Sequence, residues 1–333
     1  MTRPRLRTLA FLAGGAFGMV VLAIAALYAG FTGRGPLDKP TTLVIAKGTS
    51  VGAIASRLEA ERVIDSALMF EIGARLTGAA RLLQAGEYAF TPAMSMREVA
   101  SHLVSGRTVK RRLTVAEGMM SPHVLMLLDQ TEGLVGPLPT RVEEGSLLPE
   151  TYFYSHGDTR LEVLDRMRRS AREALDVAWR SRAPDIAVAT RDEALVLASI
   201  IEKETGDPAE RRRVAGVFHN RLRIGMRLQS DPTVIYAVTG GARVLDRDLT
   251  REDLNIDSPF NTYRAAGLPP APIANPGRDS IVAALNPEKT DLLYFVADGN
   301  GGHLFAKTLE EHNRNVAKWR AIQRRRATPG NGG

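Results

Sequence analysis

The sequence predicts a mixed α+β protein: one N-terminal transmembrane helix, then a small α+β module, then a larger α+β domain. Three observations predict this fold: an uncharged apolar run over residues 8–33, a repeated strand-and-helix pattern within residues 42–110, and helices separated by polar loops with Pro and Gly over residues 111–326. The 333 residues suffice for about two domains. The remaining segments are expected to be a tail (1–7), a linker (34–41) and a disordered C-terminal tail (327–333).

The composition excludes several classes of function. The chain has no cysteine, which excludes disulfides, cysteine-ligated metals and thiol catalysis. Lys and Arg number 44 against 37 Asp and Glu, and this net charge of +7 is scattered over expected helix faces. The six histidines form no HExxH pair, and no G-x-S-x-G or dinucleotide-binding pattern occurs. Metal, serine-hydrolase and nicotinamide chemistry therefore have no support, and we expect no cofactor.

The apolar run is long enough to cross about 30 Å of hydrocarbon as a helix. Arg3, Arg5 and Arg7 precede it, which predicts that the N-terminus stays in the cytoplasm and that the rest lies in the periplasm or outer space. The alternative is a cleavable signal peptide with a small-residue site at Ala23-Ile24-Ala25. Both interpretations place the bulk of the chain outside the cytoplasm, which excludes nucleic acid as a partner.

The module over residues 42–110 contains two similar segments. SVGAIASRL at Ser50–Leu58 and SMREVASHL at Ser95–Leu103 each follow a predicted short strand, at residues 42–46 and 85–90. The Lys-Gly-Thr turn before the first segment resembles the LysM domain, which binds the glycan strands of peptidoglycan and chitin. The alternative is a module that only packs and sets a distance from the membrane.

One carboxylate stands out in the larger domain. Thr190 and Glu193 have the spacing of a capping box and Gly206 suits a left-handed C-terminal stop, so a helix is expected between them. The helix is apolar over residues 194–201 and hence buried, and Glu202 lies on the same stripe near its C-terminal end. Burial and the negative end of the helix dipole favour the protonated form of such an acid, which a general acid requires. The alternative is an ion pair of Glu202 with a nearby Lys or Arg.

The chain also resembles a known family over most of its length. The motifs occur in the order EGSLLPETY (144–152), ASIIEKET (198–205), VAGVFHNRL (214–222), GMRLQSDPTVIY (225–236), NTY (261–263), GLPP (267–270) and LYFVADG (293–299). They resemble the YceG-like, or MltG-type, endolytic murein transglycosylases. The resemblance covers the N-terminal helix and the LysM-like module as well.

The resemblance implies an enzyme of the bacterial inner membrane that cuts the β-1,4 bond between N-acetylmuramic acid and N-acetylglucosamine in nascent peptidoglycan strands. The products would end in 1,6-anhydromuramic acid, and the enzyme would act beside the peptidoglycan synthases. The resemblance also implies that the first glutamate of E-K-E-T, Glu202, is catalytic. One carboxyl group suffices, because the substrate's own C6 hydroxyl attacks C1. Glu202 would protonate the glycosidic oxygen and then accept the hydroxyl proton, without a metal or cofactor.

The other polar residues of these motifs are expected to bind substrate or to orient Glu202, and each has a structural alternative. Asp231 before Pro232 is a good helix N-cap. Tyr152 fits the core or a wall on which sugars stack. Glu204 lies about 200° around the helix from Glu202 and is expected to cap or orient. The full set is Glu150, Tyr152, Glu204, Gln229, Ser230, Asp231, Asn261 and Tyr263.

Two other functions fit the same sequence. A muramidase that admits water would need a second carboxylate about 5–10 Å from Glu202, with Asp231 or Glu150 as candidates. A non-catalytic scaffold that binds the cell wall and guides the synthases would tolerate Glu202→Gln without loss of function.

Overall fold

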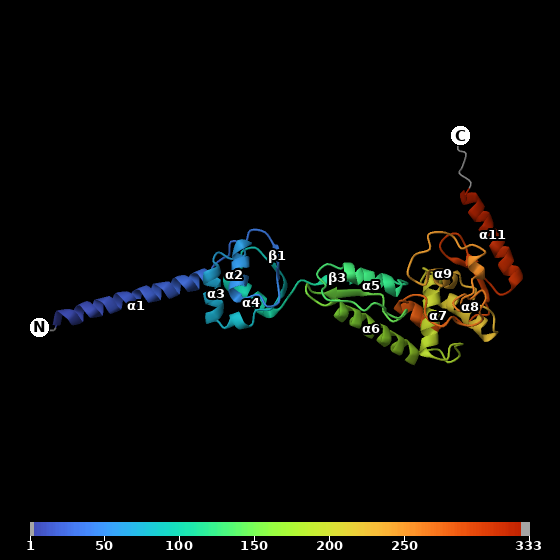
Figure 1. Cartoon of the computed structure of the whole chain (residues 1–333), viewed down its shortest axis with the longest axis horizontal. Helices are drawn as coiled ribbons and strands as arrows, with labels where there is room; N and C mark the ends of the chain where they lie inside the picture. The colour runs from blue at the N-terminus through green and yellow to red at the C-terminus, as the bar shows by residue number, and fades with distance from the viewer. Residues whose placement is uncertain (1–2, 328–333) are drawn as a thin grey trace, which may run out of the picture. The chain divides into compact units, whose positions relative to one another are not determined.

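The computed structural model describes the backbone of residues 3–327 and the side chains of residues 14–326. Figure 1 shows its helices and strands in chain order. The chain divides into two compact units, Met1–Arg111 with Phe153–Asp158, and Arg112–Tyr152 with Thr159–Gly333. The ends of the tails expected at both termini lie outside the described residues.

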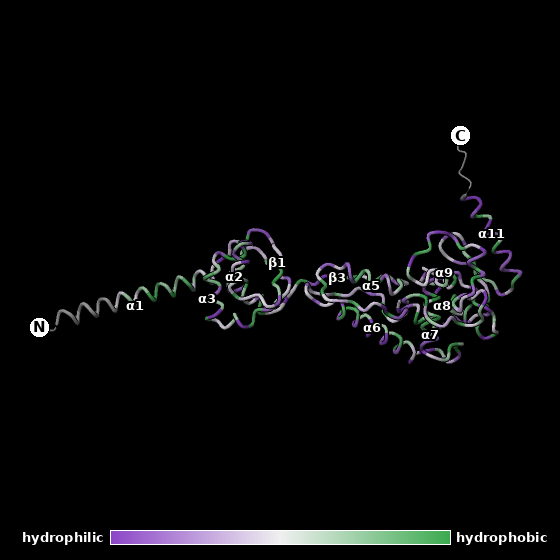
Figure 2. Tube along the Cα trace, viewed as in Figure 1, coloured by the Kyte–Doolittle hydropathy of each residue, from purple (hydrophilic) through white to green (hydrophobic). Residues whose placement is uncertain are grey.

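The first unit begins with helix α1, Arg3–Thr32. Its stretch Gly14–Thr32 has a mean hydropathy of 1.9 and is 6% buried, so by length and composition it is able to cross a membrane. Figure 2 shows hydrophobic residues recurring along it. Phe17 and Leu22 leave 72% and 71% of their surfaces exposed. This helix is therefore a candidate for a single-pass membrane anchor.

The rest of the first unit is an α+β module. Strand β1 (Thr41–Ile45) pairs antiparallel with β2 (Gly86–Phe90). The module also contains α2 (Val51–Ala60), α3 (Ala67–Leu76), the 3₁₀ turn η1 (Ala79–Arg81) and α4 (Met96–Ser105). The hydroxyl groups of Ser50 and Ser95 cap α2 and α4. Each of the two similar sequence segments therefore folds as a serine-capped helix after a strand, as predicted, whereas glycan binding by this module stays a prediction.

The segment expected as a linker, residues 34–41, is packed against this unit. The backbone N–H of Gly35 donates to the Ala93 carbonyl at 3.3 Å, and the N–H of Ala93 donates to the Leu37 carbonyl at 2.9 Å. Leu37 is 8% exposed, and Phe31 at the end of α1 is 6% exposed. The segment predicted as a linker thus also contributes to the module, because its apolar Leu37 side chain completes the core.

The second unit is built around helix α7, Arg191–Glu204. Four helices pack against it: α6 (Arg160–Arg180), α8 (Arg211–Arg223), α9 (Asp231–Thr239) and α10 (Arg278–Leu285). The other elements of this unit are α5 (Ser121–Gln130), the turn η2 (Asp253–Asn255), the hairpin of β5 (Tyr294–Ala297) and β6 (His303–Ala306), and α11 (Leu309–Ala327). Strands β3 (Arg111–Thr114) and β4 (Thr151–Tyr154) each have residues in both units. Leu197, Ile200 and Ile201 are fully buried, which confirms the prediction of a buried helix.

The two ends of α7 differ in how well the sequence predicted them. The capping box of Thr190 and Glu193 is present, as expected. The C-terminal end is not the predicted left-handed glycine: Thr205 is extended, with φ −136°, and Gly206 has no positive φ. The Thr205 hydroxyl oxygen instead accepts the N–H of Asp207 at 3.1 Å. The chain therefore leaves the helix in an extended conformation that needs no glycine.

Candidate active site

The C-terminal end of α7 carries two glutamates that face different surroundings. Glu202 and Glu204 are separated by about 200° around the helix axis. One side of the helix end faces the loop of Glu117 and Gly118 and the start of α10, and the other faces the start of α9 and the β5–β6 hairpin. The two carboxyl groups therefore lie in separate surroundings.

The Glu202 side chain is held in an ion-pair network. It is 5% exposed, its Oε2 accepts the N–H of Gly277 at 2.8 Å, and its Oε1 lies 3.6 Å from Nη2 of Arg211. The side chain of Arg211 is 8% exposed, and it also contacts Glu117 at 3.1 Å and Asp279 at 3.3 Å. These contacts fix α7, α8 and α10 to one another. The ion pair weighed from the sequence is therefore present, and the catalytic role of Glu202 stays a prediction.

Glu204 has the properties expected of a general acid. Burial raises the pKa of its carboxyl group to about 7, and the negative charge of Asp231 acts in the same direction. The Ser230 hydroxyl and the Arg221 guanidinium oppose this shift. A carboxylic acid with this pKa is about half protonated at neutral pH, so it is able both to give and to accept a proton.

Glu204 lines a cavity of about 570 Å³. The other residues of its wall come from α8, the start of α9, the loop of Tyr263, the β5–β6 hairpin and α11: Arg221, Gln229, Asp231, Tyr263, Tyr294, Phe295, Val296, Ala297, His303, Leu309, His312, Asn313, Val316 and Trp319. Aromatic rings with a few polar groups are the usual lining of a carbohydrate-sized site. The cavity therefore places the Glu204 carboxyl group beside several aromatic rings.

Asp231 and Tyr263 form a hydrogen-bonded pair in this cavity. The Tyr263 hydroxyl donates to Oδ1 of Asp231 at 2.6 Å. Burial and the neighbouring carboxylates raise the pKa of Tyr263, so its hydroxyl keeps its proton. The structural alternative for Asp231, the N-cap of α9, is off by one residue: Ser230 is the N-cap and Asp231 begins the helix. The Asp231 carboxylate is thereby available to Tyr263.

Gln229 and Ser230 connect the start of α9 to the loop of Tyr263. Gln229 lines the cavity with a left-handed backbone, φ 48°, which is unusual for a residue other than glycine. Its N–H donates to the Thr262 carbonyl at 3.1 Å, and the N–H of Ser230 donates to the Thr262 hydroxyl at 3.0 Å. These bonds hold the strained residue in place, an arrangement typical of functional sites.

The remaining predicted site residues do not line this cavity. Asn261 is fully buried, and its amide group donates to the carbonyls of Leu254 and Ile256. Asn261 therefore supports the loop that presents Tyr263.

Glu150 and Tyr152 are engaged elsewhere in the second unit. The Nε–H of Arg278 donates to Oε1 of Glu150 at 2.6 Å. The Tyr152 hydroxyl donates to the Leu148 carbonyl at 2.7 Å. Burial raises the pKa of Tyr152 to about 12. Tyr152 thus belongs to the core, one of the two alternatives that the sequence left open.

The chain matches the sequence model of one protein family over most of its length. The sequence model of the YceG-like family matches residues 43–318. The chain belongs to the YceG-like family.

Curated relatives agree with this assignment. A protein of Bacillus subtilis (strain 168) named endolytic murein transglycosylase is 36% identical over 315 residues, which cover 85% of this chain and 86% of that protein. A Streptococcus pneumoniae protein (strain R6) of the same name is 30% identical over 332 residues, covering 85% of this chain and 60% of that longer protein. A 2.6 Å crystal structure of a YceG-like protein from Listeria monocytogenes is 31% identical, with a TM-score of 0.50, and covers 83% of this chain and 98% of that one.

The wall formed by the β5–β6 hairpin and α11 of this YceG-like chain was missed by sequence reasoning. His303 opens β6, and its Nδ1 lies 2.7 Å from Oε2 of Glu210, which ties the hairpin to the start of α8. Arg221 also belongs to the wall, and its Nε donates to the Leu293 carbonyl at 2.6 Å. The sequence does contain a signal for this wall. The LYFVADG motif is followed after a short Gly-rich turn by His303, which is the pattern of a hairpin.

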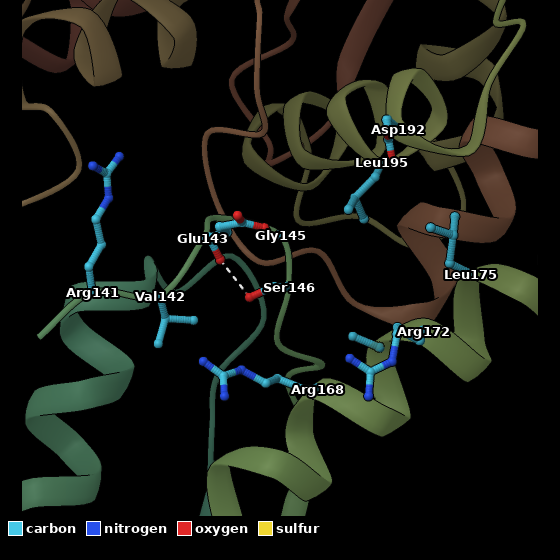
Figure 3. A pocket seen from close by; sticks show the side chains of 11 residues that line it. Arg141, Val142, Glu143, Gly145, Ser146, Arg168, Arg172, Leu175, Asp192 and Leu195 are labelled. Atoms are coloured by element: carbon cyan, nitrogen blue, oxygen red, sulfur yellow. Dashed lines mark hydrogen bonds between the residues drawn. The ribbon is translucent and has the colours of Figure 1, made fainter. Parts of the chain in front are cut away.

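A second cavity, of about 440 Å³, lies at the other end of α7 (Figure 3). Arg168 and Arg172 of α6 lie on one side and Asp192 and Leu195 of α7 on another. None of the residues predicted for the site lines it. Within residues 14–326, no group of three His, Cys, Asp or Glu side chains is arranged to hold a metal ion.

Proposed function

We propose that this chain is an endolytic murein transglycosylase that cleaves the β-1,4 bond between N-acetylmuramic acid and N-acetylglucosamine in nascent strands and leaves 1,6-anhydromuramic ends. The family and the names of the relatives support the substrate class and the reaction. The observation that carries the proposal is the Glu204 carboxyl group, with its pKa raised to about 7 at the wall of a cavity large enough for sugar rings.

We assign the general acid to Glu204 and not to Glu202, which the sequence favoured. A general acid must hold a proton and reach the substrate. Glu202 accepts a backbone N–H, faces Arg211 and does not line the cavity, whereas Glu204 lines it. Glu202 is then a structural residue that fixes the end of α7.

The proposed reaction needs one carboxyl group twice. The Glu204 acid donates its proton to the glycosidic oxygen as the bond from C1 to that oxygen breaks. The substrate's C6 hydroxyl oxygen then bonds to C1, and the Glu204 carboxylate takes the hydroxyl proton. The acid is thereby restored, and no water is consumed. The attack is intramolecular, so correct orientation of the sugar supplies much of the rate enhancement.

Hydrolysis is the second candidate, because Asp231 places another carboxylate in the same cavity. Hydrolases that use two carboxyl groups employ the second to activate water or to attack the sugar. In the proposed transglycosylase, Asp231 instead stays bonded to Tyr263 and disfavours ionisation of Glu204. The two candidates differ in the ends that they produce.

The pH dependence of cleavage tests this role of Asp231. Because the carboxylate of Asp231 raises the pKa of Glu204, Asp231→Asn is expected to lower that pKa. The acid form of Glu204 would then be lost at lower pH, so the alkaline limb of the rate profile should move to lower pH. The amide oxygen of the introduced asparagine still accepts the Tyr263 hydroxyl, so the geometry is kept. The measurement is the release of soluble fragments from purified murein between about pH 5 and 9, a range that brackets the pKa of Glu204.

The matched control is Asp257→Asn, which removes an exposed carboxylate outside the cavity. An alkaline limb that stays in place in Asp231→Asn, or that moves to higher pH, contradicts the role given to Asp231.

We also propose that the module over residues 42–110 binds glycan beside the peptidoglycan synthases.

We propose further that α1 anchors the enzyme in the inner membrane with its N-terminus in the cytoplasm. The apolar stretch Gly14–Thr32 supports the anchor. The chain should stay with the membrane fraction after carbonate extraction, and its second unit should be digested by protease added from the periplasmic side. Release by carbonate would rule out a spanning helix.

A further inference from the structure

Three arginines line a cavity next to the proposed catalytic cavity. It has a volume of about 520 Å³, and its wall consists of Arg227, Arg251, Leu254, Asn255, Tyr263 and Arg264. Tyr263 also lines the Glu204 cavity, so the two cavities share a wall. None of the six wall residues is Asp or Glu. We call Arg227, Arg251 and Arg264 the arginine cluster.

The positive charge of this cluster is not balanced by its hydrogen bonds. Arg227 donates to the backbone carbonyl of Tyr263 at 3.1 Å, and Arg264 donates to that of Asn255 at 3.0 Å. These bonds orient two guanidinium groups without neutralising them. Like charges around one cavity repel one another, so an anion between them would stabilise the arrangement.

Asp253 is a buried acidic residue close to Arg251 in the sequence, but it is already paired with another arginine. Its Oδ2 lies 2.5 Å from Nη1 of Arg247, its Oδ1 lies 3.0 Å from Nη2, and it accepts the N–H of Thr250 at 2.8 Å. Asp253 is therefore committed to a different arginine. The charge of the cluster remains available to a ligand.

We infer that the arginine cluster binds a carboxylate of the peptide that a murein strand carries on its muramic acid, beside the bond that is cut. This inference rests on the proposed function, since it takes murein as the substrate. Guanidinium groups bind carboxylates through paired N–H donors in one plane, which a lysine cannot match. The cluster would thus select strands that still carry their peptides.

A murein strand has two kinds of anion: the carboxylates of its peptides and the pyrophosphate of a lipid-linked end. The arginine cluster lies at a fixed place beside the Glu204 cavity. A cut inside a nascent strand has a peptide-bearing muramic acid next to it, whereas the pyrophosphate is present at one end only. In nascent strands the carboxylate is therefore the anion that lies beside each bond to be cut.

The test uses the full chain in detergent and the double variant Arg251→Ala, Arg264→Ala. Arg227 is kept, because it supports the Tyr263 backbone. The control is Arg169→Ala, Arg320→Ala, which removes the same charge from exposed positions on α6 and α11. The substrates are uncrosslinked strands with peptides, the same strands after an amidase has removed the peptides, and peptide-bearing strands with the lipid end still attached.

We expect the double variant to lose at least about tenfold in kcat/KM on peptide-bearing strands, with or without lipid, and to match wild type on peptide-free strands. Arg251→Lys, Arg264→Lys should recover part of this loss. A loss confined to lipid-linked strands would assign the cluster to the pyrophosphate and overturn the inference. No loss, an equal loss on all three substrates, or the same loss in the control would overturn it as well.

If wild type cuts no strand, the proposed function fails and binding decides the inference. Fluorescence anisotropy of labelled strands should then show about tenfold weaker binding of the double variant to peptide-bearing strands only. Equal affinities of the two proteins for those strands would overturn the inference independently of catalysis.

Discussion

Glu204→Gln is expected to lower the rate of murein cleavage by at least about a thousandfold, whereas Glu202→Gln should keep more than about a tenth of the wild-type rate. A glutamine in place of Glu204 has no acidic proton to donate to the glycosidic oxygen and cannot accept one from the C6 hydroxyl, so both halves of the reaction fail. A glutamine in place of Glu202 still accepts the Gly277 N–H, which the structure shows at 2.8 Å in the native protein. The measurement is the initial rate of fragment release from purified murein.

The melting temperatures of Glu204→Gln and Glu202→Gln show whether a loss of activity comes from lost catalysis or from lost folding. The pKa of Glu204 rises from 4.5 to about 7 on folding, so the protonated group favours the folded state below about pH 4.5. That contribution declines as the pH rises from 4.5 through about 7. Glu204→Gln has no charge to bury and should therefore melt at a higher temperature than wild type at about pH 8. Full activity in Glu204→Gln with loss in Glu202→Gln would return the catalytic role to the residue that the sequence favoured.

Arg211→Ala is expected to lower the free energy of unfolding by about 3 kcal/mol. Its side chain is 8% exposed, and its removal leaves the Glu202 carboxylate, 5% exposed, without its cation. The other two partners, Glu117 and Asp279, are 44% and 73% exposed and are able to turn to water. Most of the cost therefore comes from Glu202. The measurement is thermal and urea unfolding at neutral pH.

The structure offers a matched control on the same helix. Arg213 pairs with Glu288 at 3.2 Å, with both side chains about two-fifths exposed (42% and 41%), so Arg213→Ala should cost less than about 1 kcal/mol. The double variant Arg211→Ala, Glu202→Gln should be more stable than Arg211→Ala, because the unpaired buried charge is gone. Equal stabilities of Arg211→Ala and Arg213→Ala would contradict the structural role given to Glu202.

The sequence predicted local structure well where the determinants are close together in the chain. The capping box of Thr190 and Glu193 and the apolar run after it are sufficient to specify a buried helix, and α7 begins where they predict. The paired segments that begin at Ser50 and Ser95 fold as predicted for the same reason. The prediction of the helix end at Gly206 failed, because the Thr205 side chain offered a competing hydrogen bond.

The choice between the two glutamates depends on contacts far away in the sequence. Glu202 is fixed by Gly277, 75 residues later, and Glu204 faces a wall that includes the β5–β6 hairpin and α11. Periodicity shows that both sides of the helix end are enclosed, but not by which segments. For the same reason, nothing near Asp231 in the sequence specifies its hydrogen bond with Tyr263, which lies 32 residues later.

The proposed mechanism is tested most directly by the chemistry of the new ends formed in water enriched in the heavy oxygen isotope ¹⁸O. Strands with peptides are incubated with wild type and with Glu204→Gln, and the muramic ends are analysed by mass spectrometry. We expect 1,6-anhydromuramic ends without ¹⁸O from wild type and no new ends from Glu204→Gln. Reducing ends that carry ¹⁸O would mean that water attacks the sugar, with Asp231 as the second carboxylate, and would contradict the transglycosylase mechanism.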